Sequence, residues 1–297
     1  MAIDAYLKQK KGEYELKGQK LSANSNYGTL VLALTHIRPF FQHLRISQLS
    51  RQLGRDYVDY RRKRGVVSVD KDGKENRRDI SNATIAKELS ILNAALNHVK
   101  REGWIGQVPV MQLPPSPPPK DKWMNTEQVR VFVNSLKTPH IKLFALLALH
   151  TLSRKTAVLQ LQWSQVDMEN RLIDFNTPGR VRTNKRRVPV PINNILFATL
   201  QDAQELGQSD NVIEFHGKQV LDIKKGFTAA AAVAGMPWVT PHILRHTGAT
   251  LMAQKGVPLW QIAGIMGDNL DTVMKHYAKH HPDYLKEAVN KLDEMYG

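Results

Sequence analysis

The chain has 297 residues, of which 42% are hydrophobic and 23% are charged, and it contains no cysteine. This composition is typical of a globular protein with a sizeable core, and it excludes disulfide frameworks, thiolate metal sites and cysteine nucleophiles. No apolar run reaches the ~18 to 20 residues of a membrane span, and the N-terminus lacks a signal-sequence pattern, so we expect a cytoplasmic protein.

The charge balance favours a polyanionic partner. The 42 Lys and Arg residues outnumber the 27 Asp and Glu residues and give a formal net charge of +15. Cationic groups that neutralise phosphates release condensed counterions, so an excess of this size favours nucleic acid. No basic amphipathic helix with an aromatic face stands out, which disfavours a membrane surface. The alternative is a basic protein whose charge only keeps it soluble.

Helical periodicity dominates the first third of the chain. In "SNATIAKELSILNAALNHVKREG" (81–103) apolar residues form one stripe, Ser81 or Asn82 can cap the start, and Gly103 can end the helix. Residues 26–44 and 46–64 show the same pattern, and 67–80 indicates an exposed loop or hairpin. We therefore predict a small helical domain with a strongly basic surface.

Six prolines mark the clearest boundary, in "QVPVMQLPPSPPPKDKW" (107–123). Such a segment forbids helix and is typical of a semi-rigid extended linker. We therefore divide the chain into a helical DNA-binding domain (1–106), a proline-rich linker (107–123) and a second, larger domain (124–297).

The second domain mixes helical and strand patterns. Residues 125–136 begin a helix with Asn125 or Thr126 as cap. Residues 170–177 and 186–192 alternate apolar and polar positions around a basic turn, which predicts a hairpin or small sheet, and a second strand pair is expected around 211–220. From 240 onward the pattern is helical, with breaks at 256–258 and 267–269. The predicted fold is mainly α with a small antiparallel β-sheet.

The stretch "TPHILRHTGAT" (240–250) is the first candidate site. Thr240 is a good N-cap and Pro241 suits the first helical position, so His242 and Arg245 lie on one face near free backbone N–H groups. That combination suits an anion. A metal site at His242 and His246 would lack the carboxylate that should follow the first histidine, and a surface helix with incidental polar residues is the third interpretation.

Three other segments could complete such a site. Arg154 follows a helix predicted to end near residue 152 and precedes an amphipathic helix bearing Val158, Leu161 and Trp163. Arginine suits bidentate clamping of a phosphate, although a solvated charge or a helix cap is the simpler interpretation.

Tyr277, in "HYAKHH" (276–281), is the candidate nucleophile. A phenol with a pKa near ~10 needs cationic neighbours or a base to act at neutral pH, and a lone tyrosine on a helix is usually a core residue. Lys185, at the tip of the basic turn, could protonate a leaving oxygen or contact the phosphate.

The order Arg, Lys, His-x-x-Arg and Tyr resembles the tyrosine recombinases, specifically phage-type integrases. Residues 151–167 resemble the family's first arginine box, 240–256 its second box and 262–285 its tyrosine box. The helical N-terminal part and the proline segment also resemble the family's SAM-like core-binding domain and hinge, so the similarity spans nearly the whole chain.

The resemblance implies a role for each candidate. Arg154 and Arg245 would clamp the scissile phosphate, His242 would assist proton transfer, Lys185 would serve as the catalytic lysine, and Tyr277 would attack. The product would be a 3′-phosphotyrosyl link with a free 5′-hydroxyl. Neither ATP nor a metal cofactor would be required.

The resemblance also implies partners. These are double-stranded DNA at specific recombination sites, a homotetramer on synapsed DNA and DNA-bending accessory proteins, in a bacterial or phage-encoded, nucleoid-associated protein. We further expect the basic turn to contact DNA through Arg180, Arg182, Arg186 and Arg187.

Three positions depart from the family's pattern. Ala157 stands where an acidic residue is usual, three after the first arginine. The lysine register is ambiguous: one alignment places Asn184 at the family's position, and Arg182 could serve in place of Lys185. Asp268 stands where histidine or tryptophan commonly donates to the phosphate. An ionised carboxylate there would repel a phosphate, so Asp268 must turn away, be protonated or slow the enzyme.

Two alternatives remain open at the level of the sequence. Residues 249–277 scan loosely as a helix-turn-helix with Gly256 in the turn, which would fit a catalytically inactive DNA-binding regulator. A type IB topoisomerase-like relaxase would share the chemistry without a tetramer.

The final segment, 282–297, places apolar residues at helical spacing. A terminal helix usually packs on its own domain, whereas the resemblance implies docking on a neighbouring protomer. Tyr284 and Tyr296 lack the clustered basic context that we expect around a nucleophile. The residues at helical spacing are Tyr284, Leu285, Val289, Leu292 and Met295.

Overall fold

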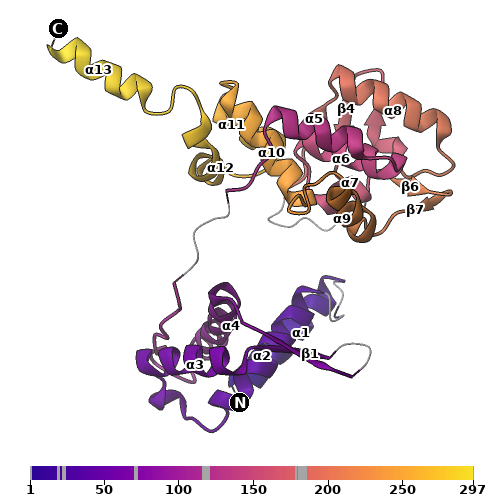
Figure 1. Ribbon diagram of the computed structural model, residues 1–297. Helices are drawn as coiled ribbons and strands as arrows, with labels where there is room; N and C mark the ends of the chain where they lie inside the picture. The colour runs from indigo at the N-terminus through magenta and orange to yellow at the C-terminus, as the bar shows by residue number, and fades with distance from the viewer. Residues whose placement is uncertain are drawn as a thin grey trace. The chain divides into compact units, whose positions relative to one another are not determined.

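The chain divides into two compact units, Met1–Lys120 and Asp121–Gly297 (Figure 1). The computed structural model describes residues 2–18, 21, 25–69, 73–115, 121–177, 179 and 186–296. Each unit has its own hydrophobic core. Within the described residues the units are mainly helical and carry three small antiparallel sheets, which confirms the predicted fold class.

The first unit is built around α4 (Asn82–Arg101), which packs against α1 and α2. The side chain of Ser81 accepts a hydrogen bond from Thr84 N at 3.2 Å and so caps this helix, while the apolar stripe led by Ile85 and Leu89 is fully buried. The remaining elements are α1 (Ala2–Leu16), α2 (Asn26–Phe41), the 3₁₀ turn η1 (Ile46–Gln48), α3 (Arg51–Arg64), β1 (Val66–Val69) and β2 (Glu75–Arg78).

Most of the predicted elements of this unit are present. The helix in 26–44 and the hairpin in 67–80 are confirmed. The single helix expected over 46–64 is wrong, because Ser50 caps a new helix by accepting from Leu53 N, so that η1 and α3 are separate. Helix α1 was not predicted.

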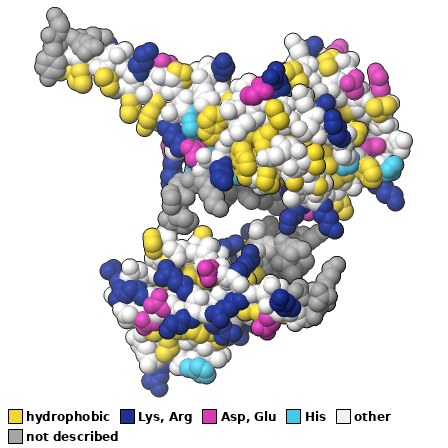
Figure 2. All heavy atoms as spheres, viewed as in Figure 1, with side chains coloured by type: hydrophobic (Ala, Val, Ile, Leu, Met, Phe, Trp, Pro, Cys, Tyr) yellow, Lys and Arg dark blue, Asp and Glu magenta, His cyan; other side chains and the backbone are white. Residues whose placement is uncertain are grey.

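A buried ion pair joins α3 to α4. The guanidinium of Arg61 donates to both carboxylate oxygens of Glu88 at 2.8 Å, and the hydroxyl of Tyr57 donates to the same carboxylate at 2.8 Å. Removing one partner would leave a buried charge without compensation. Basic side chains remain at the surface, and Figure 2 shows Lys and Arg spread over the visible face of this unit. Arg62, Lys63 and Arg64 of α3 are all exposed.

The second unit is built around α6 (Pro139–Thr151), whose side chains are apolar on almost every face. Helices α5, α7, α8 and α10 surround it. The elements in chain order are α5 (Thr126–Ser135), α6, α7 (Lys155–Leu159), η2 (Trp163–Gln165), β3 (Val166–Asp167), β4 (Leu172–Asp174), β5 (Pro189–Pro191), α8 (Asn194–Leu206), β6 (Glu214–Phe215), β7 (Lys218–Gln219), α9 (Lys224–Val233), α10 (Pro241–Gln254), α11 (Leu259–Met266), α12 (Leu270–Tyr277), η3 (Ala278–His280) and α13 (Lys286–Tyr296).

The predicted hairpin is the core of a three-stranded sheet, ordered β3-β4-β5. Strands β4 and β5 pair antiparallel with Ile173 opposite Val190, and both of these side chains are buried. Strand β3 was not predicted. The second pair, β6 and β7, confirms the strands expected around 211–220.

Helix α7 is shorter than expected. The predicted helix through Leu161 and Trp163 is wrong, because α7 ends at Leu159. Beyond it the backbone pairs with another segment: Leu161 O accepts from Val212 N at 3.0 Å and Trp163 N donates to Asp210 O at 2.9 Å. Pairing with residues 210–212 replaces the helical hydrogen bonds that the apolar spacing suggested.

Helices α6 and α10 approach each other closely at Gly248. A Cβ on this glycine would lie 2.4 Å from Leu149 O and 2.4 Å from the Leu152 side chain. No larger residue fits without moving one helix. The contact fixes the middle of α10 against the end of α6, next to the turn of α10 that carries Arg245.

Residues at both ends of the proline-rich segment pack on their own unit. Met111 is buried in the core of the first unit. In the second unit Met124 is buried, and its backbone N donates to Thr247 Oγ1 at 3.0 Å. The division of the chain after Lys120 falls within the predicted linker, 107–123. The exact domain limits remain a prediction.

Candidate active site

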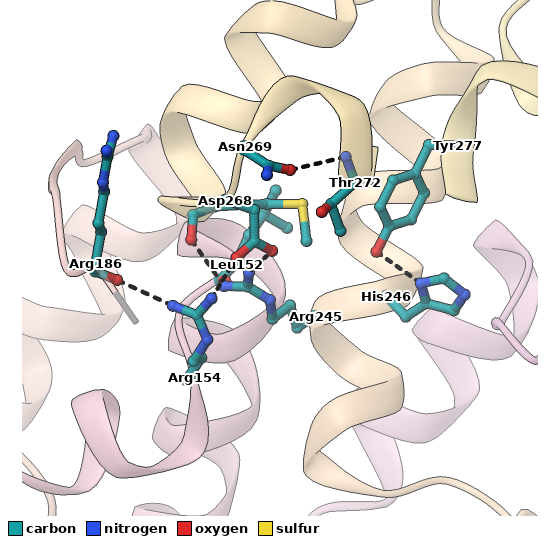
Figure 3. A network of polar contacts seen from close by, with 10 residues as sticks. Leu152, Arg154, Arg186, Arg245, His246, Asp268, Asn269, Thr272 and Tyr277 are labelled. Atoms are coloured by element: carbon teal, nitrogen blue, oxygen red, sulfur yellow. Dashed lines mark hydrogen bonds and ion pairs between the residues drawn. The ribbon is translucent and has the colours of Figure 1, made fainter. Parts of the chain in front are cut away.

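Arg245 is buried one turn into α10. Thr240 caps this helix by accepting from Ile243 N, as predicted, and Pro241 is its first residue. Only 3% of Arg245 is exposed, and its Nη1 donates to Leu152 O and, at 3.1 Å, to Met266 O (Figure 3). Burial lowers the pKa of Arg245, Asp268 opposes this change, and the guanidinium stays charged. The two carbonyls therefore fix the direction of a permanent cation.

Arg154 is placed by a tight turn between α6 and α7. Leu152 ends α6 in the left-handed conformation, with φ 52°, which costs a non-glycine residue roughly 1–2 kcal/mol. Its fully buried side chain and the bond from Arg245 to its carbonyl hold this conformation. Arg154 follows as the residue before α7, and its Nη1 donates to Arg186 O at 2.9 Å. One turn thus positions both arginines.

Asp268 lies between the two arginines. Its Oδ1 accepts from Arg154 Nη2 and its Oδ2 accepts from Arg245 Nη2 (Figure 3). Gly267, left-handed at φ 63°, ends α11 and turns the chain so that Asp268 follows it directly. In this structure, which holds no DNA, the Asp268 side chain is directed at both arginines. The carboxylate occupies the space where two oxygens of a phosphate would meet the same donors.

A small hollow opens beside the same two arginines. Its lining includes Ala157, the position where an acidic residue was expected from the resemblance. Arg154 and Arg245 both line this hollow, together with Arg186 and Val188 just before β5. The arginines thus face a concave part of the second unit.

Tyr277 is the last residue of α12 and is 5% exposed. Its hydroxyl lies 2.7 Å from His246 Nδ1 (Figure 3). Burial raises the pKa of Tyr277 to about 12, although the positive charge of Arg245 acts in the opposite direction. The phenol is therefore protonated at neutral pH, and its use as a nucleophile requires a proton acceptor.

The two histidines of α10 differ in their surroundings. The ring of His246 lies 5.0 Å from that of Tyr277, whereas His242, one turn earlier and exposed, stacks on His246 at 6.4 Å. Desolvation and the charges of Arg245 and Arg154 lower the pKa of His242. Burial lowers the pKa of His246, and Asp121 opposes this change. The sequence drew attention to His246 as a possible metal partner of His242, whereas in the structure it contacts the hydroxyl of the candidate nucleophile.

The basic turn between β4 and β5 is only partly described. Lys185, Arg180 and Arg182 lie outside the described residues, so their predicted roles rest on the sequence. The side chain of Arg186 is exposed. The guanidinium of Arg187 donates to Thr177 Oγ1 at 2.9 Å and Gln160 Oε1 at 2.5 Å, so it braces the base of the hairpin. A DNA contact by Arg187 would have to share these donors.

The arrangement suits stabilisation of an anion next to a latent nucleophile. The guanidiniums of Arg154 and Arg245 converge on the two oxygens of one carboxylate. The buried phenol of Tyr277 lies on α12, and its hydroxyl contacts His246 of α10. Donors aimed at developing charge in a partly desolvated site are effective in transition-state stabilisation. Within the described ranges no group of three potential metal-ligating side chains converges, and no helix is long and apolar enough to span a bilayer.

Two sequence models of known protein families match this chain. The sequence model of the phage integrase family matches residues 122–283, more than half of the chain, and that of the phage integrase SAM-like domain matches residues 4–112. The matched regions follow the two compact units, and the match to the second unit contains Arg154, Arg245 and Tyr277. The chain belongs to the phage integrase family, which confirms the resemblance to tyrosine recombinases.

Curated relatives agree with this assignment at low identity. The integrase of Salmonella phage P22 is 24% identical over 232 residues, which cover 72% of this chain and 58% of that protein. A XerC-like tyrosine recombinase of Caldanaerobacter subterraneus subsp. tengcongensis is 22% identical over 263 residues, which cover 73% of this chain and 67% of that protein. The chain thus spans less than two thirds of the phage relative.

Solved structures share the fold. The Tn1549 transposon integrase in complex with circular intermediate DNA has a TM-score of 0.72 at 17% identity, covering 97% of this chain and 98% of that chain. A lambda integrase dimer bound to a core site has a TM-score of 0.63 at 15% identity, and the match covers 91% of this chain and 95% of that chain.

Proposed function

We propose that this protein is a site-specific DNA recombinase that cuts and rejoins DNA through a 3′-phosphotyrosyl intermediate, integrating or excising a mobile element or prophage. The observation that carries the proposal is the convergence of Arg154 and Arg245 on the two oxygens of a single carboxylate, beside the buried phenol of Tyr277. A phosphate offers the same donors a similar pair of oxygens.

The chemistry follows from these positions. DNA places its scissile phosphate between Arg154 and Arg245 and displaces the carboxylate of Asp268. The Tyr277 oxygen attacks phosphorus, the bond to the 5′-oxygen breaks, and that oxygen takes a proton from His242 or Lys185. A 5′-hydroxyl of a second strand then attacks the phosphotyrosine and reverses the step. The covalent link conserves the bond energy, so the cycle consumes no nucleotide.

The proposed partner is double-stranded DNA. A net charge of +15 and the exposed basic residues of α3 support it. The two solved structures of similar fold cited above are integrases in complex with DNA, and this likeness also supports DNA as the partner. Binding through phosphates predicts an affinity that falls steeply with salt concentration.

The proposed working assembly is a homotetramer on synapsed DNA, aided by DNA-bending accessory proteins. Its support is the apolar face of α13, a helix that extends away from the rest of the second unit in Figure 1. Five apolar residues in or just before α13 are at least half exposed: Tyr284 50%, Leu285 60%, Val289 59%, Leu292 51% and Met295 73%. A neighbouring protomer would bury them.

The test is covalent capture. Nicked suicide duplexes with a randomised core are incubated with the protein in EDTA, and adducts are resolved on a denaturing gel. We expect an adduct with the wild-type protein, none with Tyr277→Phe, and a strong reduction with Arg154→Ala. Tyr284→Phe is the matched control and should behave as wild type.

Other outcomes would point elsewhere. Sequence-specific binding without any adduct would support a DNA-binding regulator of the helix-turn-helix kind instead. An adduct that leads only to relaxation of supercoils, without strand exchange between two sites, would support a type IB topoisomerase-like activity.

A further inference from the structure

The hydroxyl of Tyr277 faces a chain of side chains that the roles assigned so far leave unused. His246 Nδ1 lies 2.7 Å from this hydroxyl, and the other ring nitrogen, Nε2, lies 3.6 Å from Asp121 Oδ1. Each nitrogen of the ring thus has one partner, on opposite sides. We propose that His246 is the general base that activates Tyr277 and that Asp121 orients and charges this histidine. The inference rests on the proposed function, since it takes Tyr277 as the nucleophile.

The relay uses one tautomer of His246, the one that carries its proton on Nε2, on the side of Asp121. With its proton on Nε2, toward Asp121, the ring leaves a lone pair on Nδ1, which accepts the hydrogen bond that Tyr277 donates. An acidic residue behind a histidine holds the useful tautomer and stabilises the imidazolium formed on proton transfer. The order carboxylate, imidazole, hydroxyl is that of an activated nucleophile.

Asp121 is held in place by the segment that follows Tyr277. Lys279 Nζ donates to its Oδ2, and His280 Nε2 lies 3.6 Å from the same oxygen. The ring of Trp123 contacts His280 edge-on at 5.8 Å and so anchors the same stretch of chain. These contacts occupy Oδ2 and leave Oδ1 directed at His246.

The charges agree with these roles. Burial lowers the pKa of His246, so the ring is neutral at pH 7 and able to accept a proton. The hydrogen bond from Lys279 lowers the pKa of Asp121, which keeps the carboxylate ionised. The other titratable groups that act on His246 are His242, His276 and His280. Asp121 is the only one of these neighbours that favours the imidazolium.

The proton balance is closed within the site. The O–H bond of Tyr277 breaks as its oxygen bonds to phosphorus, and His246 Nδ1 keeps the proton. On rejoining, a 5′-hydroxyl attacks, the phosphotyrosine bond breaks, and the imidazolium returns the proton to the phenolate. His242, with its ring 6.4 Å from that of His246 and exposed to solvent, is left for the 5′-oxygen.

The test is the rate of adduct formation in single turnover, with nicked suicide DNA, as a function of pH. We expect His246→Gln to reduce the rate at pH 7 on the order of 100- to 10,000-fold and to abolish the fall in rate toward acid pH. Asp121→Asn should lower the maximum rate less than His246→Gln does. It should also shift the fall in rate at acid pH to lower pH, because the charge of Asp121 raises the pKa of His246 and the variant lacks this charge. His281→Gln and Asp283→Asn are matched controls in the same segment and should behave as wild type.

Chemical rescue separates a base from a structural residue. In His246→Ala, added imidazole should restore adduct formation, with more basic imidazoles more effective at equal concentration of the neutral form. Folding is checked by the thermal unfolding midpoint. A folded His246→Ala protein that reacts at the wild-type rate, or one that is inactive and gains nothing from any imidazole, would overturn the relay while leaving the recombinase proposal intact. Absence of an adduct from the wild-type protein would overturn both.

Discussion

Asp268 both organises and blocks the pair of arginines. Unit charges about 4 Å apart near a protein surface interact by about 4 kcal/mol, so a carboxylate between Arg154 and Arg245 holds two cations that would otherwise repel each other. The same carboxylate repels a phosphate and occupies its donors. A DNA phosphate that binds Arg154 and Arg245 therefore has to replace the carboxylate of Asp268.

Replacement of Asp268 tests whether its attraction for the two arginines or its competition with the phosphate has the larger effect on cleavage. We predict that Asp268→His does not reduce cleavage, because the substitution removes the competing anion and supplies a donor to the phosphate. The measurement is the yield of covalent adduct, with Asp271→His, an exposed position in the first turn of α12, as the control for charge. A severe loss of cleavage in Asp268→His alone would show that Asp268 has a positive role in positioning the arginines.

The predictability of these residues depends on how local their signals are. Arg245 and the start of α10 could be predicted because cap, proline and arginine are consecutive in sequence. The orientation of Asp268 toward the arginines could not, since it depends on the left-handed Gly267. Asp121 escaped notice because its partners, His246 and Lys279, are far from it in the chain. The only local sign for His246 was its spacing from His242.

The contact between α6 and α10 determines where Arg245 lies. We predict that Gly248→Ala lowers the free energy of unfolding of the second unit by about 1–3 kcal/mol, because the added Cβ would overlap with Leu149 O and the Leu152 side chain. Since Leu152 O also binds Arg245, cleavage should fall as well.

The measurement is urea unfolding together with adduct yield. Gly264→Ala in α11 is the matched control: nothing lies within 4 Å of its added Cβ, so alanine should be neutral or stabilise the helix by up to ~1 kcal/mol. Equal stability of the two variants would contradict the close approach of α6 and α10.

Elements with a single clear periodicity were predictable, and elements defined by distant pairing were not. Helix α4 has one apolar stripe and a capping serine, and its bounds follow from both. Helix α7 was overextended, because pairing of Leu161 and Trp163 with residues 210–212 cannot be seen in local spacing. Strand β3 has only the two residues Val166–Asp167, too short for an alternating pattern.

Five histidines link the stability of the protein to pH. Desolvation is the main cause that lowers the pKa of each of His36, His140, His150, His242 and His246. The unfolded chain, with histidine pKa values near ~6.5, therefore binds more protons than the folded protein in mildly acidic solution. Stability should rise with pH through this range and be lost as the pH falls below ~6.5.

The check is the urea unfolding midpoint at pH 7.5 and pH 5.5 without DNA, a range in which carboxylates stay ionised. We predict a lower midpoint at pH 5.5. His43→Gln, at an exposed position, should leave the difference unchanged, whereas His150→Gln should reduce it. A midpoint that is the same or higher at pH 5.5 would contradict a lowered pKa of these histidines in the folded protein.

The apolar face of the terminal helix predicts a requirement for assembly. Deletion of residues 283–297 should abolish strand exchange between two sites while binding of a single protomer to DNA survives, because the arginines, His246 and Tyr277 all precede the deletion. The measurements are strand exchange and gel-shift titration. The double variant Val289→Ser/Leu292→Ser should show the same separation, and Lys286→Gln should exchange strands normally. Normal exchange by the deleted protein would contradict a role of α13 between protomers.

The chemistry at Tyr277 is tested most directly by mapping the covalent DNA adduct. Adducts formed on nicked duplexes with a randomised core are digested with protease, and mass spectrometry identifies the peptide, the attached nucleotide and the end of the strand that carries the link. We predict a peptide in which Tyr277 bears a 3′-phosphate, with a free 5′-hydroxyl on the released strand. A link at Tyr284 or any other residue, a 5′-phosphate link, or no adduct with any duplex would contradict the proposed function.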